Sequence, residues 1–274
     1  MSRVHVGGLA LEIHEPTGEP CGTVLLLHGI GGCADTFTGV APRLAAAGWR
    51  AVAWDAPGYG ESPDPGPGVV GDDSPGAYVN VVARLLTTLG IDRAHLAGVS
   101  WGGVIATHVA ARRPELVAGL ILIDSTRGSG TTKAKAAAMR GRVSELEQQG
   151  AEAFAARRAP RLLADGPEPA AAAEVERQMS AVRVSGYAGA AEMMAQSDTG
   201  PLLPTITAPT LVLVGDEDRV TGVEESRLLA RAIPQACFGL VGRAGHAAVQ
   251  ERPAEVAAAM LAFLDRLLGK EAAR

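Results

Sequence analysis

Cysteine is scarce in this chain, and none of the cysteines has the spacing of a metal-binding pair. The sequence of 274 residues contains three, Cys21, Cys33 and Cys237, and has no C-x-x-C pair. An odd, widely spaced set favours neither a disulfide framework nor a zinc site. We therefore expect three buried thiols and no bound metal.

Excess positive charge and long apolar runs are missing as well. Lys and Arg number 25 against 30 Asp and Glu, a net charge of −5 that disfavours general nucleic-acid binding. The longest apolar run, Leu116 to Ile123, is far shorter than the roughly 18 residues that span a bilayer. Met1, Ser2 and Arg3 do not begin a secretory signal. We expect a cytoplasmic protein with no nucleic-acid or membrane partner.

Apolar runs typical of strands alternate with segments of helical periodicity. A hydrophobic content of 47% and a charged content of 20% are those of an ordinary globular enzyme. The alternation predicts an α/β domain with a mostly parallel sheet and crossover helices. The predicted strands are Val4 to Val6, Leu9 to His14, Thr23 to Leu27, Ala51 to Trp54, His95 to Val99, Val117 to Ile123, Thr210 to Val214 and Phe238 to Val241.

Helices are expected where apolar residues recur at spacings of three and four. They are Ala34 to Ala47, Pro75 to Leu89, Gly102 to Arg112, Val223 to Ala232 and Ala254 to Leu268. At the start of the chain, Gly7-Gly8 suits a tight hairpin turn and predicts an antiparallel edge.

The strand and helix alternation stops between residues 125 and 204. This segment is rich in Ala, Glu and Arg and has helical spacing without a clear strand. We interpret it as a helical lid, inserted after the sixth strand above the carboxyl ends of the strands. The alternative is a set of helices that only pack on a face of the sheet. With residues 125–204 as the lid, the core domain comprises residues 1–124 and 205–274.

One short motif indicates chemistry. Gly98-Val99-Ser100-Trp101-Gly102 follows a predicted strand and precedes a predicted helix. This is the context of a nucleophile elbow, in which small flanking residues allow a strained serine to project into a cleft. The motif also occurs by chance, so the interpretation requires a base, an acid and an oxyanion site.

A serine hydroxyl needs an imidazole to take its proton and a carboxylate to orient that imidazole. His246 lies in a Gly-rich loop after the last predicted strand and is the expected base. The expected acid is Asp218, in the loop after the strand that ends at Val214. Asp216 and Asp124 remain alternatives. The chain order Ser, Asp, His is that of α/β-hydrolases.

Stabilising the oxyanion requires backbone amides near the serine. The loop His28-Gly29-Ile30-Gly31-Gly32 follows a strand and has glycines that let a substrate approach. We assign the oxyanion hole to the amides of Ile30 and Trp101, with His28 bracing the loop. The loop lacks the ending of a P-loop and the spacing of a dinucleotide fingerprint.

With these residues in place, the chain resembles the α/β-hydrolase fold family over nearly its whole length. Within it, the chain is most similar to the 3-oxoadipate enol-lactonase group and its carboxylesterase relatives. The motifs shared with this group are Gly98 to Gly103, Gly215 to Asp218, Gly245-His246, Glu251-Arg252-Pro253 and the lid segment Ser185 to Ala190 leading to Ser197-Asp198, while Asp55 to Gly60 is shared with the wider family. Two departures are Trp101, where a smaller residue is more frequent, and Thr221-Gly222 in place of Thr-Pro, which we expect to affect only a turn.

The resemblance implies an eight-stranded hydrolase sheet and a serine hydrolase that works without metal or cofactor. It would cleave a small ester or enol-lactone through an acyl-enzyme on Ser100. Alternatives are a C–C bond hydrolase of ring-cleavage diketones and a ligand-binding protein without turnover; the oligomeric state stays open. The expected pocket residues are His28, Gly29, Trp101, Met179, Tyr187, Met193, Met194 and Val220. A basic stretch, Arg127, Lys133, Lys135, Arg140 and Arg142, forms either a solvated helix face or a site for a substrate carboxylate.

Overall fold

A computed structural model describes residues 3–66, 69 and 71–271. Met1 and Ser2, and the expected core limits at residues 1 and 274, lie outside the described residues. At the centre is an eight-stranded sheet with the order β1-β2-β4-β3-β5-β6-β7-β8. The strands are β1 (Val4–Val6), β2 (Leu9–His14), β3 (Thr23–Leu27), β4 (Arg50–Trp54), β5 (Ala94–Val99), β6 (Val117–Ile123), β7 (Thr210–Gly215) and β8 (Cys237–Val241).

The sheet is mostly parallel, as predicted. β1 pairs with β2 and β2 with β4 in antiparallel fashion, and the remaining neighbours are parallel. Strands β3, β5 and β7 are buried along their whole length, which explains their continuous apolar sequences. The loops that follow β3, β5, β6 and β7 therefore emerge at one edge of the sheet.

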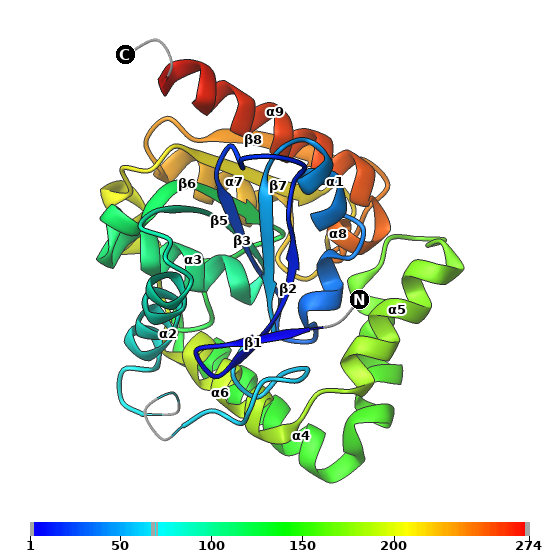
Figure 1. Cartoon of the computed structure of the whole chain (residues 1–274). Helices are drawn as coiled ribbons and strands as arrows, with labels where there is room; N and C mark the ends of the chain where they lie inside the picture. The colour runs from blue at the N-terminus through cyan, green and yellow to red at the C-terminus, as the bar shows by residue number, and fades with distance from the viewer. Residues whose placement is uncertain (1–2, 67–68, 70, 272–274) are drawn as a thin grey trace.

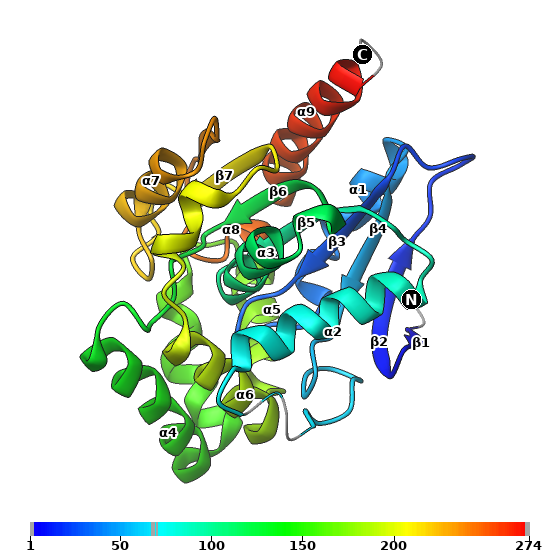
Figure 2. The same cartoon turned by 90° about the vertical axis from the view of Figure 1, so that its left-hand side faces the viewer.

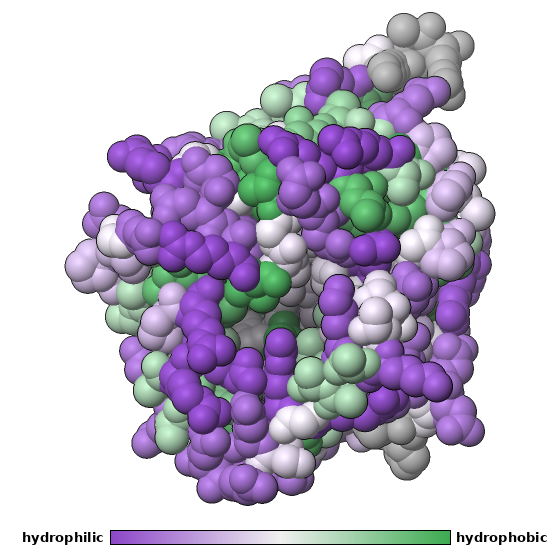
Figure 3. All heavy atoms as spheres, turned by 180° about the vertical axis from the view of Figure 1, so that it is seen from behind, coloured by the Kyte–Doolittle hydropathy of each residue, from purple (hydrophilic) through white to green (hydrophobic). Residues whose placement is uncertain are grey.

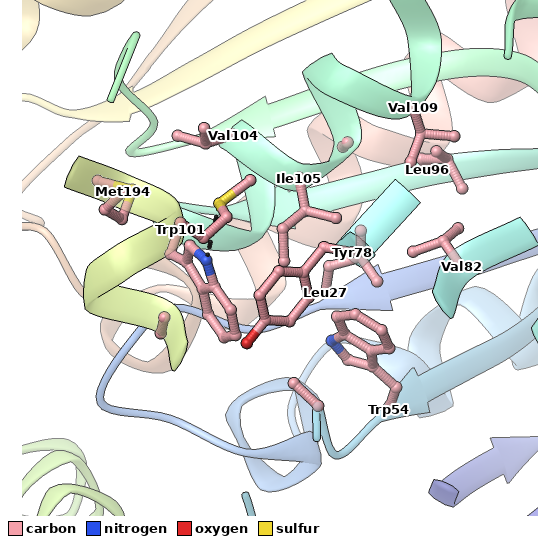
Figure 4. Packing of buried hydrophobic residues seen from close by; sticks show 14 of the residues in the cluster. Leu27, Trp54, Tyr78, Val82, Leu96, Trp101, Val104, Ile105, Val109 and Met194 are labelled. Carbon is pink, nitrogen blue, oxygen red and sulfur yellow. Dashed lines mark hydrogen bonds between the residues drawn. The ribbon is translucent and has the colours of Figure 1, made fainter. Parts of the chain in front are cut away.

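Helices cover both faces of the sheet (Figures 1 and 2). On one face, α2 (Ser74–Thr88), α3 (Trp101–Arg112) and α7 (Val223–Ala232) enclose a core that includes Trp54, Tyr78 and Ile105 (Figure 4). On the other, α1 (Ala41–Ala46), α8 (Ala248–Glu251) and α9 (Pro253–Glu271) enclose a second core around Phe37, Trp49 and Phe263. No helix in the described ranges is long and apolar enough to cross a membrane.

The single helix expected from Ala34 to Ala47 is wrong. The chain forms a short 3-10 helix, η1 (Ala34–Phe37), and then α1 from Ala41. Pro42 lies in the first turn of α1. Proline has no N–H to donate, so it is tolerated at a helix start and breaks a helix interior. A further short 3-10 helix, η3 (Pro114–Leu116), precedes β6.

Residues 125–204, called the insertion below, are helical and follow β6. Their elements are α4 (Lys133–Arg158), η4 (Ala159–Leu162), α5 (Pro169–Ser180), α6 (Val184–Gln196) and η5 (Gly200–Thr205). Helix α4 bends at Gly150, whose φ of 76° is not helical. The helices pack on one another and on η1, α2, α3 and α8 of the core. In Figure 1, α4 and α6 lie below the sheet and α5 lies at its right-hand side.

The cysteines are all free, but the expectation that they are buried is wrong. Cys21 is exposed, and Cys33 and Cys237 are partly exposed. Cys21 lies in the loop before β3, and Cys237 opens β8, which is the last strand of the sheet. A loop residue and a residue of an edge strand are both open to solvent on at least one side, which explains the exposure of these two thiols.

Candidate active site

Ser100 occupies a strained turn between β5 and α3. Its φ of 51° and ψ of −112° are rare for a residue with a side chain. Two glycines make the turn possible: a Cβ on Gly98 would collide with the backbone of Gly102, and one on Gly102 would collide with the backbone of Leu27. The turn is held to the sheet by a 2.9 Å hydrogen bond from the Ser100 amide to the carbonyl of Ile123.

Three side chains from distant loops meet at this turn. The Nε2 atom of His246 lies 3.0 Å from the Oγ of Ser100. The Nδ1 atom of the same ring lies 3.0 Å from Oδ2 of Asp218. Because Asp218 and His246 are 6% and 7% exposed, the charge that the ring acquires on protonation is shielded from water. The geometry allows the imidazole to take the serine proton while the carboxylate fixes its orientation.

Asp218 is held by its own loop. Its Oδ1 accepts hydrogen bonds from the amides of Val220, at 2.7 Å, and Thr221, at 3.1 Å. Its Oδ2 accepts a 2.6 Å hydrogen bond from the Thr221 hydroxyl. Thr221 therefore orients the carboxylate. Its position three residues after Asp218 was the available sequence signal, since Asp-x-x-Thr suits such a local hydrogen bond.

The site keeps the acid ionised and makes the base more basic. Burial alone would raise the pKa of Asp218, but the hydrogen bond and charge of His246, together with Thr221 and Val220, lower that pKa to about 2. Burial would likewise lower the pKa of His246. The hydrogen bond and charge of Asp218 and the charge of Asp124 outweigh it, so the His246 pKa lies above its ordinary value of 6.5.

Neither alternative acid contacts the imidazole. Asp216 is exposed, and its carboxylate accepts a hydrogen bond from the amide of Ala244 at 3.3 Å. Asp124 is buried, with one oxygen bound to the amide of Gly215 at 2.8 Å and the other to the amide of Ala248 at 3.2 Å. Burial raises the pKa of Asp124 to about 8. Asp124 thus joins the ends of β6 and β7 to the start of α8.

The loop after β3 lies beside the elbow serine. A Cβ placed on Gly29 would be 3.5 Å from the Cβ of Ser100. Within the described residues, the amide of Ile30 donates to no backbone carbonyl. The amide of Trp101 begins α3, where N–H groups have no acceptor inside the helix. Both amides are therefore available for an oxyanion.

His28 braces this loop as a neutral ring. Its Nε2 accepts a 3.1 Å hydrogen bond from the amide of Ala56, so the proton is on Nδ1, which donates to the carbonyl of Gly29 at 2.7 Å. Complete burial lowers the pKa of His28 to about 4. Sequence reasoning missed Tyr59, whose hydroxyl donates to the carbonyl of Ile30 at 2.9 Å.

A cavity of about 850 Å³ opens between the serine and the insertion. Its lining includes the predicted residues Gly29, Ile30, Trp101, Met179, Tyr187, Met194 and Val220. Figure 3 shows a hollow near the middle of one face of the molecule, with hydrophobic atoms at its base and hydrophilic residues along much of its rim.

Two predicted pocket residues do not line the cavity. His28 is completely buried behind the loop and packs edge-on against the rings of Tyr59 and Trp101, with ring centroids 4.9 and 5.8 Å away. Met193 is completely buried, and its Sδ accepts a 3.2 Å hydrogen bond from the indole Nε1 of Trp101. Both predictions of pocket contact are wrong, because these side chains pack on the aromatic residues under the elbow.

The predicted basic stretch divides into two groups. Lys135 and Arg142 line the cavity. Arg127 pairs with Glu225 at 2.9 Å, Arg140 pairs with Glu192 at 2.7 Å, and Lys133 is exposed outside the cavity.

Comparison with known proteins identifies the family of the chain. Residues 22–253 match the model of the alpha/beta hydrolase fold family, so the chain belongs to that family. It is similar to a 2-hydroxy-6-oxononadienedioate/2-hydroxy-6-oxononatrienedioate hydrolase from Paraburkholderia phymatum, with 29% identity over 94% of this chain and 92% of the relative.

Solved structures are similar over the same extent. A thermophilic esterase from Thermogutta terrifontis has a TM-score of 0.86 and 28% identity, covering 97% of this chain and 99% of its own. The enol-lactonase from Burkholderia xenovorans LB400 has a TM-score of 0.82 and 24% identity, covering 96% of this chain and 100% of its own, which supports the fold alone.

Proposed function

We propose that the protein is a serine hydrolase that cleaves a carboxylic ester or lactone of a small molecule through an acyl-enzyme on Ser100. One observation carries the proposal: the 3.0 Å contacts that join Ser100 to His246 and His246 to Asp218 at the wall of a cavity. A protein that only binds ligands has no need of a strained serine beside a buried imidazole and carboxylate.

The proposed reaction follows from the atoms in contact. Ser100 Oγ attacks the substrate carbonyl while His246 Nε2 accepts its proton, and Asp218 stabilises the resulting imidazolium. The amides of Ile30 and Trp101 donate to the developing oxyanion. His246 then returns the proton to the departing alcohol. A water molecule, deprotonated by the same ring, attacks the acyl group, and the ring returns that proton to Ser100 Oγ as the acid leaves.

We further propose that the insertion acts as a cap that selects the substrate. Support comes from its side chains in the cavity wall, among them Met139, Val175, Met179, Tyr187 and Met194. Met and aromatic side chains provide an adaptable apolar surface for an acyl group.

The test combines covalent labelling with turnover. A fluorophosphonate should add its phosphonyl mass to Ser100 in a tryptic peptide, and the protein should hydrolyse p-nitrophenyl butyrate. The Ser100→Ala variant should show neither effect while unfolding at a similar temperature. A wild-type protein that is neither labelled nor active would favour the ligand-binding alternative and refute the proposal.

A second candidate is hydrolysis of a C–C bond, favoured by the name of the Paraburkholderia relative. The same triad can serve both reactions, so the substrate decides between them. Cleavage of a vinylogous ring-cleavage diketone, with p-nitrophenyl butyrate and enol-lactones left intact, would establish this alternative and exclude the ester hydrolase.

A further inference from the structure

The cavity wall carries an unusual amount of positive charge for a protein with a net charge of −5. Among the described residues that line the cavity, the only carboxylate is that of Glu225. Five cationic side chains line it: Lys135, Arg142, Arg158, Arg161 and Arg219.

Two of these five charges are already neutralised by acids next to them. Arg158 pairs with Glu145 at 2.6 Å. Arg219 pairs with Asp165 through two hydrogen bonds, at 2.9 and 2.6 Å. A guanidinium paired with a carboxylate contributes little net positive charge to the cavity.

The single acid in the wall does not compensate for the other three. Both oxygens of Glu225 accept hydrogen bonds from Arg127, at 2.9 and 3.0 Å. Among the ion pairs of the described residues, none includes Lys135, Arg142 or Arg161. Three cations of the cavity wall therefore form no ion pair among the described residues, and the acid nearest in sequence to Arg142, Glu145, is already shared by Arg157 and Arg158.

The position of these charges suits a substrate that reaches the serine. Lys135 and Arg142 are seven residues apart on α4, two turns of helix, and so lie on one face of it. Arg161 belongs to η4, which follows directly. Arg142 is half-buried and lines the same cavity as Ser100 and His246.

We propose that Lys135, Arg142 and Arg161 form an anion-binding subsite that holds a carboxylate or phosphate group of the substrate away from the bond being cleaved. As a statement about substrates, this rests on the proposed ester hydrolysis. Like charges that share a partly enclosed cavity repel one another, and a bound anion relieves the repulsion. The planar guanidinium of an arginine can bind either group through two parallel hydrogen bonds.

The first experiment compares two esters of similar length, the anionic mono-p-nitrophenyl glutarate and the neutral p-nitrophenyl valerate. The wild type should prefer the anionic ester in kcat/KM by about tenfold or more, the value of a charge-assisted hydrogen bond. Arg142→Gln should remove most of that preference, mainly through KM for the anionic ester.

Arg140→Gln is the matched control. It makes the same change of charge on the same helix, but Arg140 is exposed and paired with Glu192 outside the cavity. The control should retain the preference of the wild type. An equal loss in both variants would mean that the preference arises from net charge, and it would overturn the subsite.

The second experiment measures binding without turnover. The Ser100→Ala variant is titrated calorimetrically with glutarate and, separately, with inorganic phosphate. Binding that weakens about tenfold or more when Arg142→Gln is added supports the subsite, and the ion that binds identifies the group. Binding of neither ion, or binding that Arg142→Gln leaves unchanged, overturns it.

The two experiments separate the two proposals. Hydrolysis of both esters without preference would refute the subsite and leave the ester hydrolase intact. Glutarate binding through Arg142 in a protein that hydrolyses neither ester would refute the proposed function and leave the subsite intact.

Discussion

Replacing Asp218 by asparagine should nearly abolish activity, because the asparagine would turn its NH₂ group, and not an oxygen, toward His246. Oδ1 of Asp218 accepts from two backbone amides, and Oδ2 accepts from Thr221 and faces Nδ1 of His246. An asparagine has one oxygen for these two sets of donors. If its NH₂ faced the backbone amides, two buried donors would lose their acceptor, at about 1–3 kcal/mol each.

The oxygen of the asparagine should therefore face the backbone, and its NH₂ should face His246. Nδ1 must then accept, which places the ring proton on Nε2, the atom that faces Ser100. An imidazole in this tautomer cannot take the serine proton. We expect kcat to fall by about 10³- to 10⁴-fold with little change in KM.

Asp216→Asn is the matched comparison. Asp216 is exposed, and the amide of an asparagine can still accept the hydrogen bond from Ala244. Its kcat should stay within about twofold of the wild type. The assay is p-nitrophenyl butyrate hydrolysis, with thermal unfolding to show that both variants fold. A larger loss for Asp216→Asn, or more than a tenth of wild-type activity in a folded Asp218→Asn, would refute the tautomer reasoning.

Three further outcomes are expected. His246→Ala should remove at least about 10³-fold of kcat in a protein that still folds, as circular dichroism would check; retained activity would exclude it as the base. In a pH series, kcat/KM should rise with pH through a pKa above 6.5, because only neutral His246 accepts a proton. Asp218→Asn should move the pH profile of any residual activity to lower pH. A midpoint below 6.5 in the wild type would contradict this expectation. Asp124→Asn should lower the free energy of unfolding by about 1–3 kcal/mol, because the NH₂ of the asparagine must face the amide of either Gly215 or Ala248. Urea titration would measure the loss, and unchanged stability would refute the bracing role of Asp124.

The positions next to strand ends were the predictable part of this molecule. Ser100, Asp218 and His246 each follow a short apolar strand, and parallel strands bring the loops at their carboxyl ends to one edge. Their convergence could be anticipated because the topology of a parallel sheet leaves few alternatives.

Side-chain direction inside the insertion was less predictable. Met193 and Met194 are neighbours on α6, yet one packs on Trp101 and the other lines the cavity. Successive helical residues point about 100° apart, and α6 is buried around most of its surface. The polar residues Ser185, Glu192 and Gln196 mark its less buried face, but both methionines lie on the wide buried remainder, so the sequence does not show which of them meets a substrate.

Contacts between distant loops were also hidden. The hydrogen bond from the Tyr59 hydroxyl to the carbonyl of Ile30 links positions 29 residues apart. That Lys135, Arg142 and Arg161 line the cavity without an ion-pair partner follows only from the positions of the acids in the folded chain. The break before α1 was different, since Pro42 was a signal in the sequence.

The joint between η4 and the histidine loop limits how this protein can be re-engineered. The amide of Ala247 donates to the carbonyl of Leu162, and Glu251 accepts from the amides of both Gly245 and Ala164. Exchanging the whole helical segment with that of a relative would disturb the backbone that carries His246, the proposed general base. Mutant libraries confined to the cavity-facing side of α4 leave these hydrogen bonds in place. The cavity wall can therefore be varied there without moving the loop that carries His246.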